Sequence, residues 1–501
     1  MLKKELLFYI VLFILILAIT MATTDYFDND LWARLIAGMG VIDGGHVLKT
    51  DFLSYTPVHT WWDHEWGSGV IFYAFLKFLG PYSLIILQAV LMFGIFFIAS
   101  RVVKMRSHTH PFNIMFYFFA LVAALETLNR PIRCHMFTFL LFTLFIYLLE
   151  KVRKGNNKLL YILPVIILFW NNIHGGVVSG LGLIFMYALG EFLNKKPFKK
   201  YIYTLIACCA VLFINPWGYD YIKFLLMANT MPRTFIVEWW SIFHPIHTFD
   251  YPAFKFLMFT LVAGQFIFLF KQIKSDKNWF NNIDKVKYIV IIATLYLSIS
   301  HIKLLPFFII TSICFIYEDF YELIKNIKLP LWKDKVVYGL LIFMSLFTFI
   351  SKDFSLPVGM NEYPVKEVEF IKQNKIGGKI LTNFGVGSYV AYKLYPQNLI
   401  FMDGRYEEVY PDYMILLLKQ FYIVSEHWDE LLIYLKPDVM ILEKNYPIYE
   451  HMKKSKEWKV IYEGDIYGVF VPYETSYNNF VQPSNDINYY KNNLFTTDIK
   501  F

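Results

Sequence analysis

The sequence has little charge and little cysteine. Only 17% of its 501 residues are charged, and four are cysteines. A soluble domain ordinarily carries about 25% charged residues. The missing charge is replaced by long apolar runs, so an ordinary soluble enzyme and a disordered protein are both excluded. The cysteines lie in or beside apolar runs and include no CxxC pair, so no disulfide framework is expected.

Several common functional motifs are also absent. The sequence contains no P-loop, GxSxG, HExxH or dinucleotide-binding fingerprint, so we do not expect cofactor-driven chemistry. The net charge of +7 does not indicate nucleic acid, because the basic residues lie in short loops beside apolar runs. There they are typical of a signal that orients a membrane protein.

Hydrophobic residues make up 57% of the chain and fall in blocks. A membrane span needs about 17–25 mostly apolar residues. Eleven segments are candidates: 6–23, 82–100, 112–128, 134–150, 159–173, 177–193, 201–215, 253–270, 286–300, 304–319 and 335–350. The first follows Lys3 and Lys4 and is predicted to be an uncleaved span. The aromatic segment 66–79 contains Gly67 and Gly69, and we interpret it as an interfacial or re-entrant helix.

Loop charges predict the orientation. With Lys3 and Lys4 inside, every second loop is rich in lysine and arginine, and the loops between are poor in them. This alternation satisfies the positive-inside rule, and counting 66–79 as a span would break it at every later loop. Nearly all unusual polar residues then share the external face, where they would line a cavity or pathway.

The last span is predicted to end outside, near Ser351. Residues 357–473 contain strand-like runs at 379–382, 399–402, 439–442, 459–462 and 468–471, with helical runs between them. We therefore predict an α-helical polytopic protein of the bacterial cell membrane with about eleven transmembrane helices in residues 1–350. Its first external loop is 24–81, its C-terminal extracytoplasmic α/β domain is 357–473, and 474–501 is a flexible tail.

The first external loop carries the strongest candidate for chemistry. Asp28 and Asp30 follow the first span, and a helix starting near Asp30 would place Arg34 one turn on, on the same face. A carboxylate can take a proton from an acceptor hydroxyl, and a guanidinium can neutralise a departing phosphate. The two carboxylates can also hold a divalent cation. The alternative is a helix N-cap with an ordinary ion pair.

Further candidates for substrate binding lie on the same predicted face. Asp63, His64 and Glu65 lie among three tryptophans, which also fit an interfacial aromatic belt. Arg130 and Arg133 suit a lipid phosphate. The alternative is that both side chains snorkel to external headgroups. The remaining candidates are His174 before two glycines, Glu238 before two tryptophans, and His301 with Lys303 at a span junction. Each of these also has a structural interpretation, as a helix hairpin, an interfacial stretch or a buried polar pair. Asp403-Gly404 follows a predicted strand and is interpreted first as a turn.

Taken in order, these motifs resemble the GT-C superfamily of integral-membrane glycosyltransferases, in particular a bacterial branch. The resemblance covers residues 6–473 and is carried by these segments: Asp28-Asn29-Asp30-Leu31-Trp32, Trp62-Asp63-His64-Glu65-Trp66, Asn172-Ile173-His174-Gly175-Gly176, Asn215-Pro216-Trp217-Gly218 and Phe401-Met402-Asp403-Gly404-Arg405.

The resemblance implies transfer of a sugar from a polyprenyl-phosphate-linked donor, outside the cytoplasm, to a glycan, lipid or protein. It implies that a first-loop acid acts as base or metal ligand, a role that falls to Asp30 first and Asp28 second. Two other functions stay open: a polysaccharide polymerase or ligase, and a non-catalytic membrane assembly or transport protein. A transporter typically has charges at mid-span and paired repeats, and neither is found in the sequence.

Overall fold

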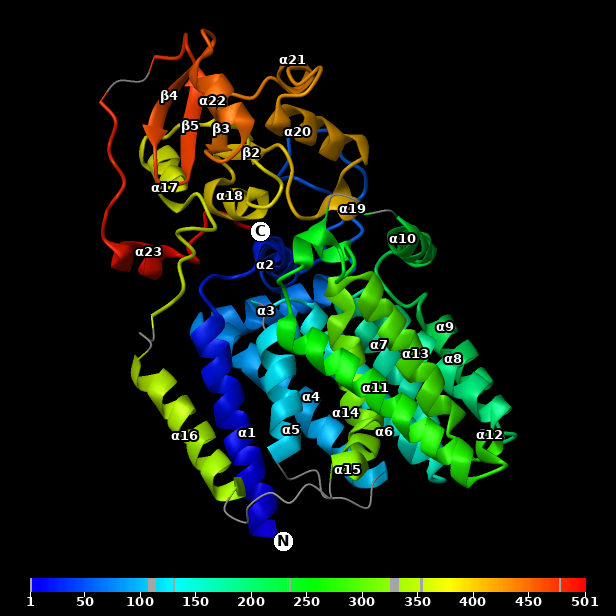
Figure 1. Ribbon diagram of the computed structural model, residues 1–501. Coiled ribbons are helices and arrows are strands. Elements are labelled where there is room, and N and C mark those ends of the chain that lie inside the picture. Colours follow the sequence, from blue (N-terminus) through cyan, green and yellow to red (C-terminus); the bar gives the residue numbers. More distant parts are fainter. Residues whose placement is uncertain are drawn as a thin grey trace. The chain divides into compact units, whose positions relative to one another are not determined.

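The computed structural model describes residues 2–106, 114–128, 131–231, 233, 236–324, 333–351, 355–476 and 479–501. The chain forms two compact units. The helical unit comprises residues 1–23, 85–130 and 134–354, and the mixed unit comprises 24–84, 131–133 and 355–501. Many of the helices and strands are labelled in Figure 1. The first loop, which we predicted to belong with the membrane helices, is grouped with the C-terminal residues.

The helical unit consists of helices joined by short connections, and each of the eleven apolar runs contains at least one of them. They are α1 (Leu2–Thr23), α4 (Tyr82–Arg106), α5 (Ile114–Val122), η1 (Ala123–Thr127), α6 (His135–Arg153), η2 (Asn157–Tyr161), α7 (Ile162–Ile173), α8 (Val177–Leu193), α9 (Lys199–Val211), α10 (Tyr219–Thr230), η3 (Val237–Trp239), η4 (Pro245–His247), α11 (Pro252–Ser275), α12 (Trp279–Asn282), α13 (Lys285–Ser300), η5 (Ile302–Leu304), α14 (Leu305–Phe315), α15 (Tyr317–Ile324) and α16 (Lys333–Ser351).

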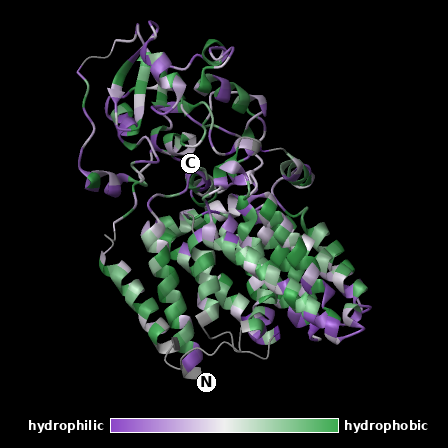
Figure 2. Cartoon of the chain, viewed as in Figure 1, coloured by the Kyte–Doolittle hydropathy of each residue, from purple (hydrophilic) through white to green (hydrophobic). Residues whose placement is uncertain are grey.

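Four helices of the described residues are long and apolar enough to cross a membrane. They are Lys4–Thr23, Tyr82–Arg106, His135–Arg153 and Pro252–Ser275. The pair Ile302–Phe315 and Tyr317–Leu323, bent by 61°, counts as a fifth if it is one span. The helices of this unit are hydrophobic along most of their length (Figure 2). The chain is therefore a multi-pass membrane protein.

A buried ion network connects four segments of the helical unit. Glu150 of α6 is 3% exposed and accepts hydrogen bonds from Arg106 of α4, Arg153 and Tyr187 of α8. Asp284, which caps α13, pairs with both arginines, 3.0 Å from Arg106 and 2.8 Å from Arg153. Ionic groups removed from water are tolerated only when they are paired. The network therefore holds α4, α6, α8 and α13 in one register.

The mixed unit contains a five-stranded sheet in the order β2-β1-β3-β5-β4. Strand β1 is parallel to β2 and β3, whereas β5 is antiparallel to β3 and β4. The strands are β1 (Gly378–Leu381), β2 (Asn398–Ile400), β3 (Val439–Glu443), β4 (Trp458–Glu463) and β5 (Tyr467–Pro472). The helices are α2 (Asn29–Ile42), α3 (Trp66–Leu79), α17 (Val365–Gln373), α18 (Gly387–Leu394), α19 (Tyr406–Val409), α20 (Tyr413–Ile423), α21 (Glu430–Leu435), α22 (Pro447–Lys453) and α23 (Ile487–Asn493).

Residues of the first loop extend this sheet at its β2 edge. Ile400 donates its amide to the carbonyl of Leu53 at 2.9 Å and accepts the amide of Tyr55 at 3.1 Å. Helices α2 and α3 pack so closely that a Cβ on Gly38 would lie 2.2 Å from the carbonyl oxygen of Gly69. The backbone bonds to Ile400 thus join the first loop to the C-terminal residues, and the packing of α2 on α3 holds the loop itself together.

Trp32 of α2 is at the centre of the aromatic core of this unit. Its ring lies 5.1–5.7 Å from those of Tyr363, Tyr389, Tyr392 and Phe495. The residues that we predicted as a flexible tail contribute to this packing through Phe495. Lys393 also donates to the carbonyl oxygens of Asn493, at 2.7 Å, and Thr496, at 2.9 Å.

Candidate functional site

Asp28 and Asp30 lie at the start of α2 and differ in exposure. Asp28 is the N-cap: its Oδ1 accepts the amide of Asp30 at 3.0 Å, and its side chain is 7% exposed. Asp30 is in the first turn, and its side chain is 40% exposed. Capping requires a short acceptor at that position. Asp28 therefore caps the helix, and Asp30 is the more exposed of the two carboxylates.

Arg133 pairs with both carboxylates. Its Nε contacts Asp28 Oδ2, and its Nη2 lies 3.4 Å from Asp30 Oδ2. The short segment Pro131–Arg133 belongs to this unit and brings the Arg133 guanidinium to the acidic pair. A divalent cation prefers several oxygen ligands around itself. With a guanidinium already bridging the two carboxylates, the pair does not fit a metal site.

The Asp403-Gly404-Arg405 turn lies directly against Asp30. A Cβ on Gly404 would come 2.7 Å from Asp30 Oδ1 and 3.9 Å from Ser388 Oγ. Arg405 is itself buried, paired with Asp51 at 2.6 Å and with Asp403 at 2.9 Å. Its guanidinium lies over the ring of Trp61 at 4.6 Å. The turn therefore has a fixed conformation, and glycine leaves room for the Asp30 carboxylate.

Arg34 is buried in a second cluster of the same unit. It pairs with Asp63, with Glu65 at 3.6 Å and with Glu408 at 2.9 Å. Burial, opposed by Arg34 and reinforced by Glu408, raises the pKa of Asp63 to about 6. Helix α2 begins at Asn29, as predicted within one residue, so Arg34 is one turn from Asp30. Its ion pairs, however, join the first loop to α19.

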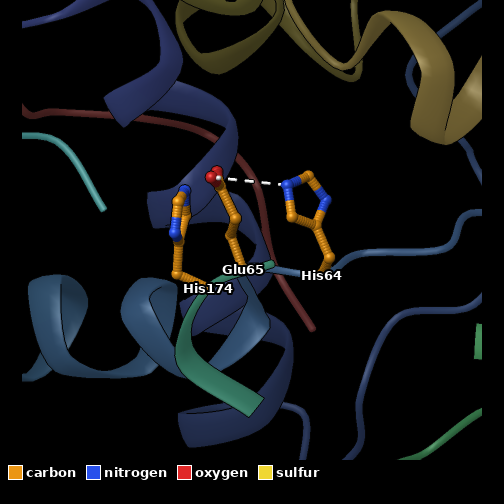
Figure 3. A group of neighbouring side chains, drawn as sticks. All are labelled: His64, Glu65 and His174. Atoms are coloured by element: carbon orange, nitrogen blue, oxygen red, sulfur yellow. Dashed lines mark ion pairs between the residues drawn. The ribbon is translucent and has the colours of Figure 1, made fainter. Parts of the chain in front are cut away.

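His64 belongs to this cluster. Its Nδ1 lies 2.7 Å from Glu408 Oε1, and its Nε2 lies 3.6 Å from Glu65 Oε1, the pair marked in Figure 3. Burial lowers the pKa of His64, but the charges of Glu408 and Glu65 outweigh it and raise this pKa to about 9. At neutral pH His64 is therefore an imidazolium, a hydrogen-bond donor at both nitrogens.

His174, also drawn in Figure 3, belongs to the helical unit. It ends α7, and its Nδ1 accepts the amide of Gly176 at 3.0 Å. Thr138 Oγ1 lies 2.7 Å from the same nitrogen and accepts the indole N–H of Trp170 at 2.9 Å. A nitrogen that accepts cannot carry the proton, so His174 is the Nε2–H tautomer.

Three basic side chains of the helical unit gather around Trp239. Arg233 lies over the indole at 4.5 Å and Lys303 at 5.3 Å. The His301 ring is 5.3 Å away, and its Nδ1 is 2.6 Å from the carbonyl oxygen of Trp239. Such contacts hold cations over a ring face. Glu238 precedes Trp239 in η3 and is half-buried.

The structure thus distributes the predicted site residues over three clusters. Asp28, Asp30 and Arg133 form the first, and Arg34, Asp63, His64 and Glu65 form the second. His301 and Lys303 form the third, with Glu238 beside them, and His174 follows α7 in the helical unit. Arg130 lies outside the described residues. Sequence reasoning missed Glu408, Arg233 and Asp51, and only the Asp403-Gly404-Arg405 turn marked the neighbourhood of Glu408.

No known protein-family model matches the sequence, and no curated protein matches it. Among solved structures, the single-particle cryo-EM structure of the arabinofuranosyltransferase AftD from Mycobacteria is similar, with a TM-score of 0.51 and 11% sequence identity. The match covers 93% of this chain and 40% of AftD, so the chain spans about two fifths of the AftD length.

A crystal structure of the Archaeoglobus fulgidus oligosaccharyltransferase tethered with an acceptor peptide matches with a TM-score of 0.49 and 10% identity. That match covers 87% of this chain and 69% of the other. The chain therefore has a fold similar to that of AftD, in agreement with the GT-C resemblance of its motifs.

Proposed function

We propose that the protein transfers a sugar from a polyprenyl-phosphate-linked donor to a glycan, lipid or protein acceptor on the outer side of a bacterial cell membrane. Asp30 is the general base. The observation that carries this proposal is the exposure of Asp30 beside a buried, capping Asp28. In the proposed topology about eleven helices cross the membrane, the N-terminus is cytoplasmic, and the first loop and C-terminal domain are outside.

The chemistry needs one proton acceptor and a place for a phosphate leaving group. The acceptor hydroxyl gives its proton to Asp30 while its oxygen bonds to the anomeric carbon and the bond from that carbon to the phosphate oxygen breaks. The configuration at that carbon inverts. Arg133 lies 3.4 Å from Asp30 Oδ2 and holds this carboxylate in place.

The helical unit, taken by itself, contains cations that suit a phosphate group. Arg233 and Lys303 lie over one indole with His301 beside it. Guanidinium and ammonium groups bind phosphate oxygens by charge-assisted hydrogen bonds. The polyprenyl chain of such a donor is apolar, so it can lie among apolar helices without exposing its surface to water. These features support a lipid-linked donor over a nucleotide sugar.

The test replaces Asp30 with Asn and measures cell-surface glycan together with lipid-linked sugars. Glycan output should fall by at least a hundredfold, and a lipid-linked sugar should accumulate, because the base is removed without a change of shape. Asp25→Asn, an exposed acid of the same loop, is the matched control and should leave both unchanged. Full output from Asp30→Asn in an inserted protein would indicate a non-catalytic assembly role.

A further inference from the structure

Glu408, a residue of α19 that follows the Asp403-Gly404-Arg405 turn, is buried and contacts three side chains of the first loop. Its Oε2 accepts from Arg34 Nη2 at 2.9 Å and from Trp61 Nε1 at 3.0 Å, and its Oε1 lies 2.7 Å from His64 Nδ1. Its side chain is 5% exposed. One carboxylate of the C-terminal residues therefore contacts two cations and an indole donor more than 340 positions earlier.

The backbone at Glu408 makes the same connection. Its carbonyl oxygen accepts the amide of Trp62 at 3.2 Å, and the carbonyl of Val409 accepts the amide of His59 at 2.9 Å. These bonds fix the 59–62 segment independently of the carboxylate. The carboxylate is therefore not needed to hold this segment, and its negative charge interacts with Arg34 and His64. A fold-stabilising ion pair already exists nearby, between Asp51 and the fully buried Arg405.

The side chains around Glu408 differ in their exposure. His64 is 18% exposed and Glu65 is 13% exposed, whereas Arg34 is 4% exposed. Because Glu408 contacts Nδ1 of His64, the Nε2 edge is directed to Glu65. A carboxylate on one ring nitrogen sets the orientation of the other, as it does in catalytic and metal-binding histidines.

We propose that Glu408 is a positioning residue: the C-terminal domain completes the first-loop site by fixing the Arg34 guanidinium and the His64 imidazole. The effect of Glu408 on sugar transfer rests on the proposed function. Its fixing of the His64 imidazole does not depend on that function. Within this unit, the charged groups facing the imidazole are Glu408 of α19, Glu65 beside it in the chain, and Arg34 of α2. Replacing Glu408 by Gln keeps its shape and an acceptor oxygen but removes its charge.

The experiment measures carbethoxylation of His64 by diethyl pyrocarbonate in the purified full-length protein, followed by mass spectrometry. The reagent attacks only the neutral imidazole. In Glu408→Gln the labelling rate of His64 at pH 7.5 should rise by about tenfold or more, since the pKa moves toward the ordinary value of about 6.5. His427, 64% exposed, is the internal standard, and Glu457→Gln, an exposed acid of the same unit, is the matched control.

The outcomes separate the two proposals. Faster labelling of His64 together with at least a tenfold loss of glycan output in Glu408→Gln supports the positioning role. Unchanged labelling, or faster labelling with full glycan output, overturns it. If Asp30→Asn also leaves glycan output intact, the transfer function fails, while the labelling result still decides whether Glu408 holds His64.

A measurement on the unaltered protein covers the case in which Glu408→Gln does not fold. Labelling of His64 as a function of pH should reach half its maximum near pH 9, where the structure places the pKa. A midpoint near pH 6.5 would mean that Glu408 does not hold the imidazole, and would overturn the proposal.

Discussion

Gly404 lies against the carboxylate of Asp30, although 374 positions separate the two residues in the chain. A methyl group at Gly404 would come 2.7 Å from Asp30 Oδ1. The contact joins the acidic motif of the first loop to the turn after β2, and two motifs that are weak by themselves meet at one carboxylate. Both belong to the mixed unit, so the contact depends on the pairing of the first loop with the C-terminal sheet.

Gly404→Ala should displace Asp30 while leaving the fold intact. The atom that the new methyl group meets is at the end of a side chain, which can rotate away at little cost. Small displacements of a catalytic group can lower a rate about a hundredfold. We expect at least a tenfold loss of glycan output with a thermal midpoint within a few degrees of the original.

Gly377→Ala is the control for this change. A Cβ there would be 3.4 Å from the nearest atom, the carbonyl oxygen of Gln397, so the methyl group fits with a slight adjustment. Full glycan output is expected from it. Equal activity of the two alanine variants would show that the approach of Gly404 to Asp30 does not matter for transfer.

Glu150→Ala should destabilise the helical unit. The change leaves Arg106, Arg153 and Tyr187 without their shared buried acceptor. Removing one partner of a buried ion pair costs about 3–5 kcal/mol. The measurement is the free energy of unfolding of the detergent-solubilised protein. Glu426→Ala, at a side chain that is 90% exposed, should change it by less than about 0.5 kcal/mol.

Stability should fall at alkaline pH because of His64. Its pKa is raised to about 9 in the folded protein, so the folded state binds the proton more tightly than the unfolded state. The resulting stabilisation is fully present below about pH 6.5 and is lost as the pH rises through 9. The expected loss is on the order of 2–3 kcal/mol.

This prediction is checked by thermal or denaturant unfolding between pH 6.5 and 10 for the original protein and for His64→Asn. The difference between the two curves removes the contribution of other titrating groups. It should shrink across this window, and a constant difference would contradict the raised pKa.

Local patterns accounted for most of the secondary structure. The five predicted strands lie within two residues of β1 to β5, and each apolar run contains a helix. Apolar runs and short β-branched segments between turn residues favour helices and strands through residues only a few positions apart. They can therefore be recognised in the sequence. Helices α18 and α22 were not predicted, because both are short and are stabilised by burial against the sheet.

The partners of the site residues could not be predicted in the same way. Four residues separate Asp30 and Arg34 on one helix, yet Arg34 pairs with Asp63 and Glu408. Nothing in the sequence around Glu408 distinguishes it from the exposed acids of the same unit. Its burial and its three contacts arise only when α19 packs on the 59–64 segment.

The sequence by itself determined that this chain crosses a membrane, ends in a small α/β domain and carries an acidic pair at the start of a helix. These properties depend on hydrophobic transfer and on capping, which act locally along the chain. The tertiary structure alone decided which of the two acids is exposed and which remote residues surround it. Those choices depend on burial and on charges brought together over hundreds of residues, and no local pattern encodes them.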